Sequence, residues 1–91
     1  MKKITTIYVP CKKGIQSIDV PLYAIILGCR LKDLGFCKCA IEVTLLGHAD
    51  VKSSREFVVL KMGEKTKLEG LIYIGEAKEK DVRHFLFEVA K

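Results

Sequence analysis

The residues of this chain that are best suited to chemistry are its cysteines and histidines, namely Cys11, Cys29, Cys37, Cys39, His48 and His84. Thiolate and imidazole groups bind zinc, and zinc sites in sequences are usually recognised by paired ligands at short spacing. Cys37 and Cys39 form one such pair, but no second Cys or His pair completes the pattern. We therefore predict no metal site and no cofactor.

Thiols have other uses, and the favoured interpretation is that they are buried as small hydrophobic groups. A disulfide that joins Cys11 or Cys29 to the Cys37 region stays open, and so does a cysteine nucleophile in a small enzyme. The chain has no G-x-S-x-G, Walker or G-x-G-x-x-G motif. We therefore predict that the protein is not an enzyme and has no small-molecule substrate.

Positive charge is the second chemical resource of the chain, which holds 16 Lys+Arg against 11 Asp+Glu, a formal net charge of +5. Such an excess favours an anionic partner, DNA or RNA. For any single lysine, a solvated surface charge is the simpler interpretation. The candidate nucleic-acid-binding residues fall in three segments: Lys12 and Lys13, then Gly47, His48 and Lys52, and finally Lys78, Lys80 and Arg83.

The elements that position these segments follow from the apolar pattern. Alternating apolar and β-branched residues predict strands over 3–9, 37–46, 71–77 and 82–90. Helical spacing predicts one helix from Asp19 to Gly35 and another from Asp50 to Gly63, each begun by a capping aspartate and ended by a glycine. The order β-α-β-α-β-β predicts an α/β fold, a single-domain two-layer sandwich with a four-stranded mixed sheet and two helices.

This fold would bring two of the basic segments together. If the first two strands are parallel neighbours, Lys12 and Lys13 leave the same sheet edge as His48 and Lys52, beside a helix N-terminus that attracts phosphate. The apolar segments are shorter than the roughly 20 residues that cross a bilayer, and no signal peptide is visible. We expect a cytoplasmic protein with no membrane partner.

The chain also resembles the Alba family of archaeal DNA- and RNA-binding chromatin proteins. The matching stretches are "IYVPCKK", "YAIILGCRLKDLGFCKCAIEVTLLGHADVKSSREFVVL" and "IYIGEAKEKDVRHFLFEVAK". The resemblance implies an Alba-like fold, a nucleoid-associated homodimer, and sequence-tolerant binding of double-stranded DNA or RNA as a chromatin or ribonucleoprotein component. It places Lys12 and Lys13 against the phosphate backbone, Gly47, His48 and Lys52 at a strand-to-helix turn, and Lys78, Lys80 and Arg83 on arms that follow the minor groove.

The sequence departs from the family pattern at several positions. His48 stands where the family usually has arginine, which implies a weaker and pH-dependent contact. Glu79 and Asp81 add negative charge to the hairpin. These departures leave open an alternative, an Alba-fold protein-interaction or assembly module that has lost nucleic-acid binding.

Overall fold

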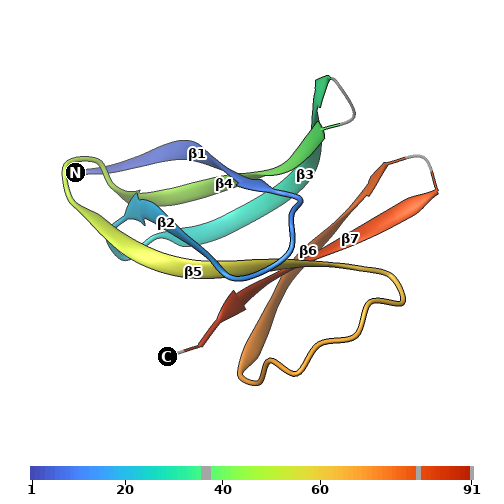
Figure 1. Cartoon of the computed structure of the whole chain (residues 1–91). Coiled ribbons are helices and arrows are strands. Elements are labelled where there is room, and N and C mark those ends of the chain that lie inside the picture. Colours follow the sequence, from blue (N-terminus) through green and yellow to red (C-terminus); the bar gives the residue numbers. More distant parts are fainter. Residues whose placement is uncertain (36–37, 80, 91) are drawn as a thin grey trace.

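All the regular secondary structure of the described residues is β-strand (Figure 1). The structure, a computed structural model, describes residues 1–35, 38–79 and 81–90. The strands are β1 (Lys2–Pro10), β2 (Gln16–Pro21), β3 (Ile25–Gly35), β4 (Lys38–His48), β5 (Lys52–Lys61), β6 (Leu71–Glu79) and β7 (Val82–Val89). The described residues contain no helix, so none of their segments is a helix that could cross a membrane. The predicted α/β sandwich with two helices is therefore wrong.

The strands form two antiparallel sheets, and the chain passes back and forth between them. A three-stranded sheet has the order β1-β4-β3, and a four-stranded sheet has the order β2-β5-β7-β6. The strands predicted at 3–9, 71–77 and 82–90 are confirmed as β1, β6 and β7, and the strand predicted at 37–46 corresponds to β4 in the described residues. Position 37 lies outside the described residues.

The segment predicted as the first helix is divided between β2, a turn and β3. The turn follows Pro21, and Tyr23 within it has a φ of 55°. In β3, a register shift between Ile26 and Gly28 places Ile26, Cys29 and Leu31 toward the core. A bulge of this kind inserts one residue into the two-residue period of a strand. The resulting spacing of three and then two residues resembled the apolar stripe of a helix.

The segment predicted as the second helix is β5. Phe57, Val58 and Val59 are consecutive and all buried. A strand buried on both faces produces a continuous apolar run, which periodicity alone does not distinguish from a buried helix. The β-branched valines favour the strand. Gly63, predicted to end a helix, instead takes a φ of 86° in the turn that follows β5.

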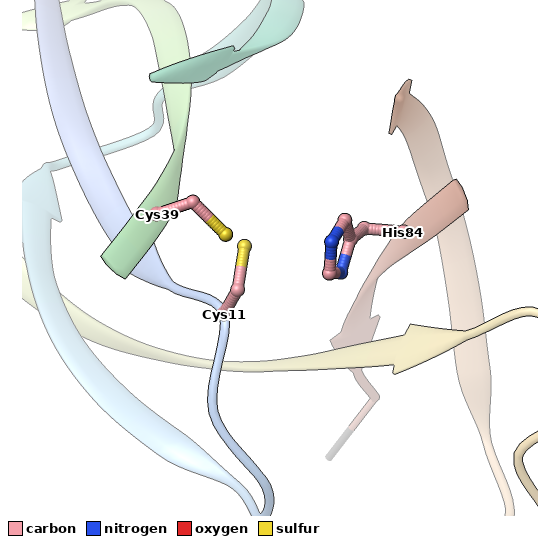
Figure 2. A group of neighbouring side chains, drawn as sticks. All are labelled: Cys11, Cys39 and His84. Atoms are coloured by element: carbon pink, nitrogen blue, oxygen red, sulfur yellow. The ribbon is translucent and has the colours of Figure 1, made fainter. Parts of the chain in front are cut away.

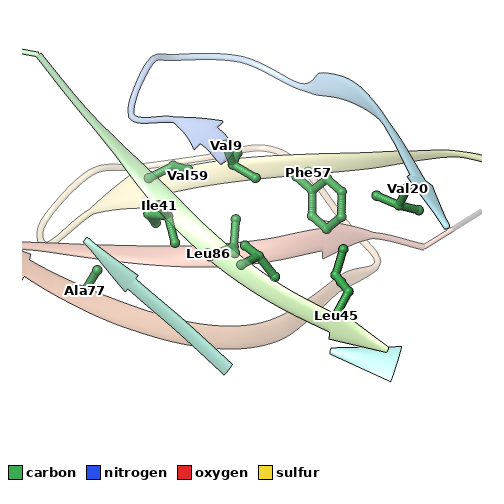
Figure 3. Packing of buried hydrophobic residues seen from close by; sticks show 9 residues of the cluster. Val9, Val20, Ile41, Leu45, Phe57, Val59, Ala77 and Leu86 are labelled. Carbon is green, nitrogen blue, oxygen red and sulfur yellow. The ribbon is translucent and has the colours of Figure 1, made fainter. Parts of the chain in front are cut away.

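The core lies between the two sheets (Figure 3). Its buried side chains are Val9, Ile41, Val43 and Leu45 from the three-stranded sheet, and Val20, Phe57, Val59, Ala77 and Leu86 from the four-stranded sheet. The alternation predicted for β4 is confirmed, because Ile41, Val43 and Leu45 share the core-facing side. On the outer face of the three-stranded sheet, Ile4, Tyr8 and Ile25 are exposed.

Candidate functional site

The basic segments that were predicted to converge lie at opposite ends of β4. β1 runs antiparallel to β4, with Lys2 opposite His48 and Pro10 opposite Ala40. Lys12 comes two residues after Pro10, so it lies near the Ala40 end of β4, and the strand from Ala40 to His48 is roughly 25 Å long at about 3.3 Å per residue. The predicted convergence assumed parallel strands and is wrong.

At the His48 end of β4, two of the residues that were predicted to bind nucleic acid pack against their neighbours in the chain. A Cβ atom at Gly47 would stand 2.7 Å from Cβ of Pro21, so only glycine fits there without a shift. The His48 amide donates to the Leu22 carbonyl at 3.2 Å, and the His48 ring meets the Tyr23 ring edge-on with centroids 5.9 Å apart. Lys52 is exposed at the start of β5. Gly47 and His48 therefore shape a turn.

The hairpin of β6 and β7 carries the third predicted segment. Lys78 and Arg83 are opposite each other, and both are exposed. Arg83 donates to Glu76 at 2.7 Å and lies 5.4 Å from the centre of the Phe85 ring, so it forms an exposed ion pair within the hairpin. Lys80 lies outside the described residues.

Every arginine of the chain is engaged in an ion pair. Arg30 pairs with Glu42, Arg55 with Glu88, and Arg83 with Glu76. No lysine makes an ion pair within the parts of the chain that the structure describes. The excess positive charge of the protein therefore resides on its lysines.

Some of these lysines gather at one end of the core. Lys12, Lys13 and Lys61 line a pocket of about 160 Å³ together with Cys11, Val59, Glu64 and His84. Lys61 comes from β5, so the pocket joins residues from distant parts of the chain. Two residues predicted as binding residues, Lys12 and Lys13, are thus placed together. Lys61 was not predicted, because its segment was assigned to the solvated face of a helix.

Hydrogen bonds hold the loop that carries Lys12 and Lys13. The Cys11 amide donates to the Cys39 carbonyl at 3.1 Å, and the Lys12 amide donates to the Pro10 carbonyl at 2.9 Å. The buried Gln16 side chain donates from Nε2 to the same Pro10 carbonyl at 2.8 Å. These bonds attach both ends of the loop to the sheets and give its lysines a defined position.

The opposite wall of the pocket is also held by hydrogen bonds. Lys61 is opposite His84 in the pairing of β5 with β7. The Lys61 amide donates to Oε1 of Glu64 at 3.1 Å, and the Glu64 amide donates to the Lys61 carbonyl at 3.0 Å. This turn sets Lys61 and Glu64 side by side at the pocket wall.

Beneath the lysines lies a group of potential metal ligands. Cys11, Cys39 and His84 each offer one ligand atom, and these atoms lie within 4.8 Å of one another. Figure 2 shows the three side chains pointing toward one another from the end of β1, from β4 and from β7. His84 is buried, with 4% of its surface exposed, and both cysteines are partly buried.

Sequence reasoning missed this group because its members come from three separate segments. The expected signature was a local pair of ligands, whereas the antiparallel pairing of β1 with β4 is what sets Cys11 beside Cys39. The group could have been found from the sequence only by predicting the antiparallel pairing of β1 with β4. We expected the first two strands to be parallel neighbours, and that arrangement does not bring Cys11 and Cys39 together.

The family resemblance stays a prediction from sequence, and the described residues lack the two helices that it implies. Comparisons with known proteins place the chain in no family, since no family model, no curated protein and no solved structure matches it.

Proposed function

We propose that this protein binds the sugar–phosphate backbone of DNA or RNA without reading the base sequence. The observation that carries the proposal is the gathering of Lys12, Lys13 and Lys61 around one pocket at one end of the core. All three lysines are exposed. Like charges are held close together there with a single carboxylate, that of Glu64, among them. Such a concentration of positive charge favours a polyanion.

The predominance of lysine over arginine among the available cations supports binding that does not depend on the base sequence. Arginine reads guanine bases through a planar, bidentate fork, whereas lysine acts as a flexible point charge. The guanidinium groups of Arg30, Arg55 and Arg83 each pair with a glutamate, whereas no lysine of the described residues makes an ion pair. The cations left for a ligand are lysines, which suit contacts to phosphates rather than to base edges.

Lys78 of the β6–β7 hairpin lies near the pocket along the sheet but faces away from it. β7 lies between β5 and β6, and neighbouring strands are about 4.8 Å apart. Lys78 on β6 stands one residue beyond the row of Lys61, His84 and Ala77, so its side chain points to the face of the sheet opposite the core and the pocket. Lys78 therefore does not extend the basic surface of the pocket, and Arg83 of the same hairpin is paired with Glu76.

The experiment compares two triple variants with the same change of charge. Lys12→Ala/Lys13→Ala/Lys61→Ala removes the pocket lysines, and the matched control Lys2→Ala/Lys3→Ala/Lys67→Ala removes three exposed lysines that do not line the pocket. Binding to duplex DNA and to structured RNA is measured as a function of salt. The pocket variant is expected to weaken binding to all sequences and to reduce the log–log salt slope for duplex DNA by about 2 to 3. The control is expected to change the slope by less than about 1.

Two results would count against the proposal. No binding of the unmodified protein to either nucleic acid at low salt would remove it. Equal losses in the two triple variants would show a diffuse charge effect instead of a site at the pocket. Tighter binding to one of the two polymers would identify DNA or RNA as the partner.

A second candidate function is self-association through the outer face of the three-stranded sheet, in line with the predicted homodimer. Leu46 of β4 is flanked by Ile4 on β1 and by Ile25 on β3, and both isoleucines are exposed. The exposed Tyr8 lies further along β1. Exposed apolar groups from neighbouring strands are typical of interaction surfaces. Sedimentation of the protein should show a dimer that Ile25→Lys dissociates and Val82→Lys, on the hairpin, does not; a monomer at all concentrations would exclude this function.

A further inference from the structure

We infer that Cys11, Cys39 and His84 form a binding site for a thiophilic divalent metal ion, with Zn²⁺ as the ion of best chemical fit. Two of these side chains, Cys11 and His84, also line the basic pocket, but the inference does not rest on nucleic-acid binding. It departs from the expectation from sequence that the protein has no metal site.

The spacing of the donor atoms is close to that of a formed site. The two sulfur atoms and a ring nitrogen of His84 lie within 4.8 Å of one another. In a tetrahedral zinc site, Zn–S distances of about 2.3 Å and Zn–N distances of about 2.0 Å separate the ligand atoms by roughly 3.5 Å. Side-chain movements of the order of 1 Å are enough to close the group on an ion.

The backbone fixes the ligands from both sheets. Cys11 is tied to Cys39 by its amide hydrogen bond to the Cys39 carbonyl, at 3.1 Å. His84 belongs to the four-stranded sheet, where it stands between Lys61 and Ala77 in the register. A bound ion would therefore link the two sheets at the end of the core. This position gives metal binding a direct effect on the stability of the fold.

The donor set selects the class of metal. Thiolate and imidazole ligands suit zinc and related transition metals, whereas calcium and magnesium require oxygen ligands. A divalent ion with two thiolates and a neutral imidazole has no net charge, so it can be held beside buried hydrophobic side chains such as Val59. The pocket of about 160 Å³ that Cys11 and His84 line has room for a water molecule as a fourth ligand.

The experiment uses the full chain, reduced and freed of metal with a chelator under anaerobic conditions. Co²⁺ is the spectroscopic probe, because tetrahedral cobalt–thiolate sites have strong sulfur-to-metal charge-transfer and visible d–d absorption. We expect one Co²⁺ per chain and displacement of Co²⁺ by Zn²⁺. Saturating Zn²⁺ should raise Tm by at least about 10 °C.

Single substitutions locate the site. Cys11→Ser, Cys39→Ser and His84→Ala are each expected to weaken Zn²⁺ binding by at least about 100-fold. Cys29→Ser is the matched control, because Cys29 lies in β3 and is not a member of the ligand group. This variant should keep the cobalt spectrum. The spectrum and the Tm shift of the unmodified protein test the site even if one ligand variant fails to fold.

Three outcomes would overturn the inference. The reduced protein could show no cobalt–thiolate absorption and no Tm shift with Zn²⁺. The Cys29→Ser variant could lose metal binding as fully as Cys11→Ser, which would place the ion elsewhere. The reduced protein could also fail to take up metal and form a Cys11–Cys39 disulfide on exposure to air, which would make the pair of thiols a redox pair instead.

Discussion

The Sγ atom of Cys29 in β3 lies 2.6 Å from the position that a Cβ atom at Gly75 in β6 would occupy. The two sheets thus approach each other so closely at this edge that the thiol fills the place of a side chain at residue 75. The register of β6 with β7 shifts between Tyr73 and Gly75, beside the same contact. Gly75 is therefore required by the packing of one sheet on the other.

A double-mutant cycle tests this contact. Gly75→Ala should destabilise the fold by about 1–3 kcal/mol, since overpacking forces the thiol or the backbone to move. In the Cys29→Ala background the same substitution should have a smaller effect, with a coupling energy of about 0.5–3 kcal/mol. Urea unfolding of the four proteins measures both quantities. Gly28→Ala is the control, because a Cβ atom at Gly28 meets nothing within 4 Å; an equal loss of stability there would contradict the argument.

Because of Cys29, the stability of the fold should decrease as the pH rises in the alkaline range. Burial raises the pKa of the Cys29 thiol. Below the unfolded pKa of about 8.5, both the folded and unfolded chains keep the proton. Above it, the unfolded chain ionises while the folded chain keeps the proton, so stability is lost as pH rises through the folded pKa. Urea unfolding between about pH 7 and pH 10 should show a steeper loss for the unmodified protein than for Cys29→Ala; identical pH profiles would contradict it.

The ion pair of Arg55 and Glu88 should matter more to stability than the other pairs. Nε and Nη2 of Arg55 both donate to the Glu88 carboxylate, and Nη1 of Arg55 donates to the Ala24 carbonyl at 2.9 Å. The hydrogen bond to Glu88 raises the pKa of Arg55. Arg55→Lys keeps the charge but loses the fork, and we expect a loss of about 1–3 kcal/mol in the free energy of unfolding.

The exposed pair of Arg83 and Glu76 provides the matched control. Its side chains are 44% and 41% exposed, compared with 25% and 18% for Arg55 and Glu88. Arg83→Lys should therefore change the stability by less than about 1 kcal/mol. Thermal and urea unfolding measure both variants, and an equal effect of the two substitutions would show that burial does not set the strength of these pairs.

A substitution at Gly47 distinguishes a role in packing from a role in nucleic-acid binding. Its absent side chain leaves space for Pro21 and Ala24, whose Cβ atoms would lie 2.7 Å and 3.3 Å from a Cβ atom at residue 47. Gly47→Ala should lower the free energy of unfolding by about 1–3 kcal/mol. The folded variant should keep its affinity for nucleic acid and its salt slope. A stable variant with weakened binding would restore Gly47 to the interface.

Several strands were predictable from the sequence because their apolar residues alternate without interruption. Ile41, Val43 and Leu45 in β4 alternate in this way, and both strands of the β6–β7 hairpin lie where they were predicted. The strands taken for helices violate simple alternation. β3 contains a bulge near Gly28, and β5 is buried on both faces around Val58. In both cases tertiary packing, which a local pattern does not contain, determined the structure.

The candidate sites were predictable only in part. Lys12 and Lys13 were identified because they stand together after a strand, and the loop keeps them together. Their meeting with Lys61, like the meeting of Cys11 with His84, depends on which strands pair and which sheets face each other. Strand pairing across long segments leaves no mark in local spacing, so the wrong topology produced the wrong neighbours.

The pairing of β1 with β4 and of β2 with β5 has a consequence for how the protein acquires its structure. The early strands have no partners among the segments next to them, and β5 joins the rest of its sheet through the late strand β7. Long loops must close before these contacts can form, which makes folding slow, on the scale of milliseconds to seconds for all-β domains. A growing chain would present the bare edges of β1 and β2 during that interval, when they are open to mispairing with other chains.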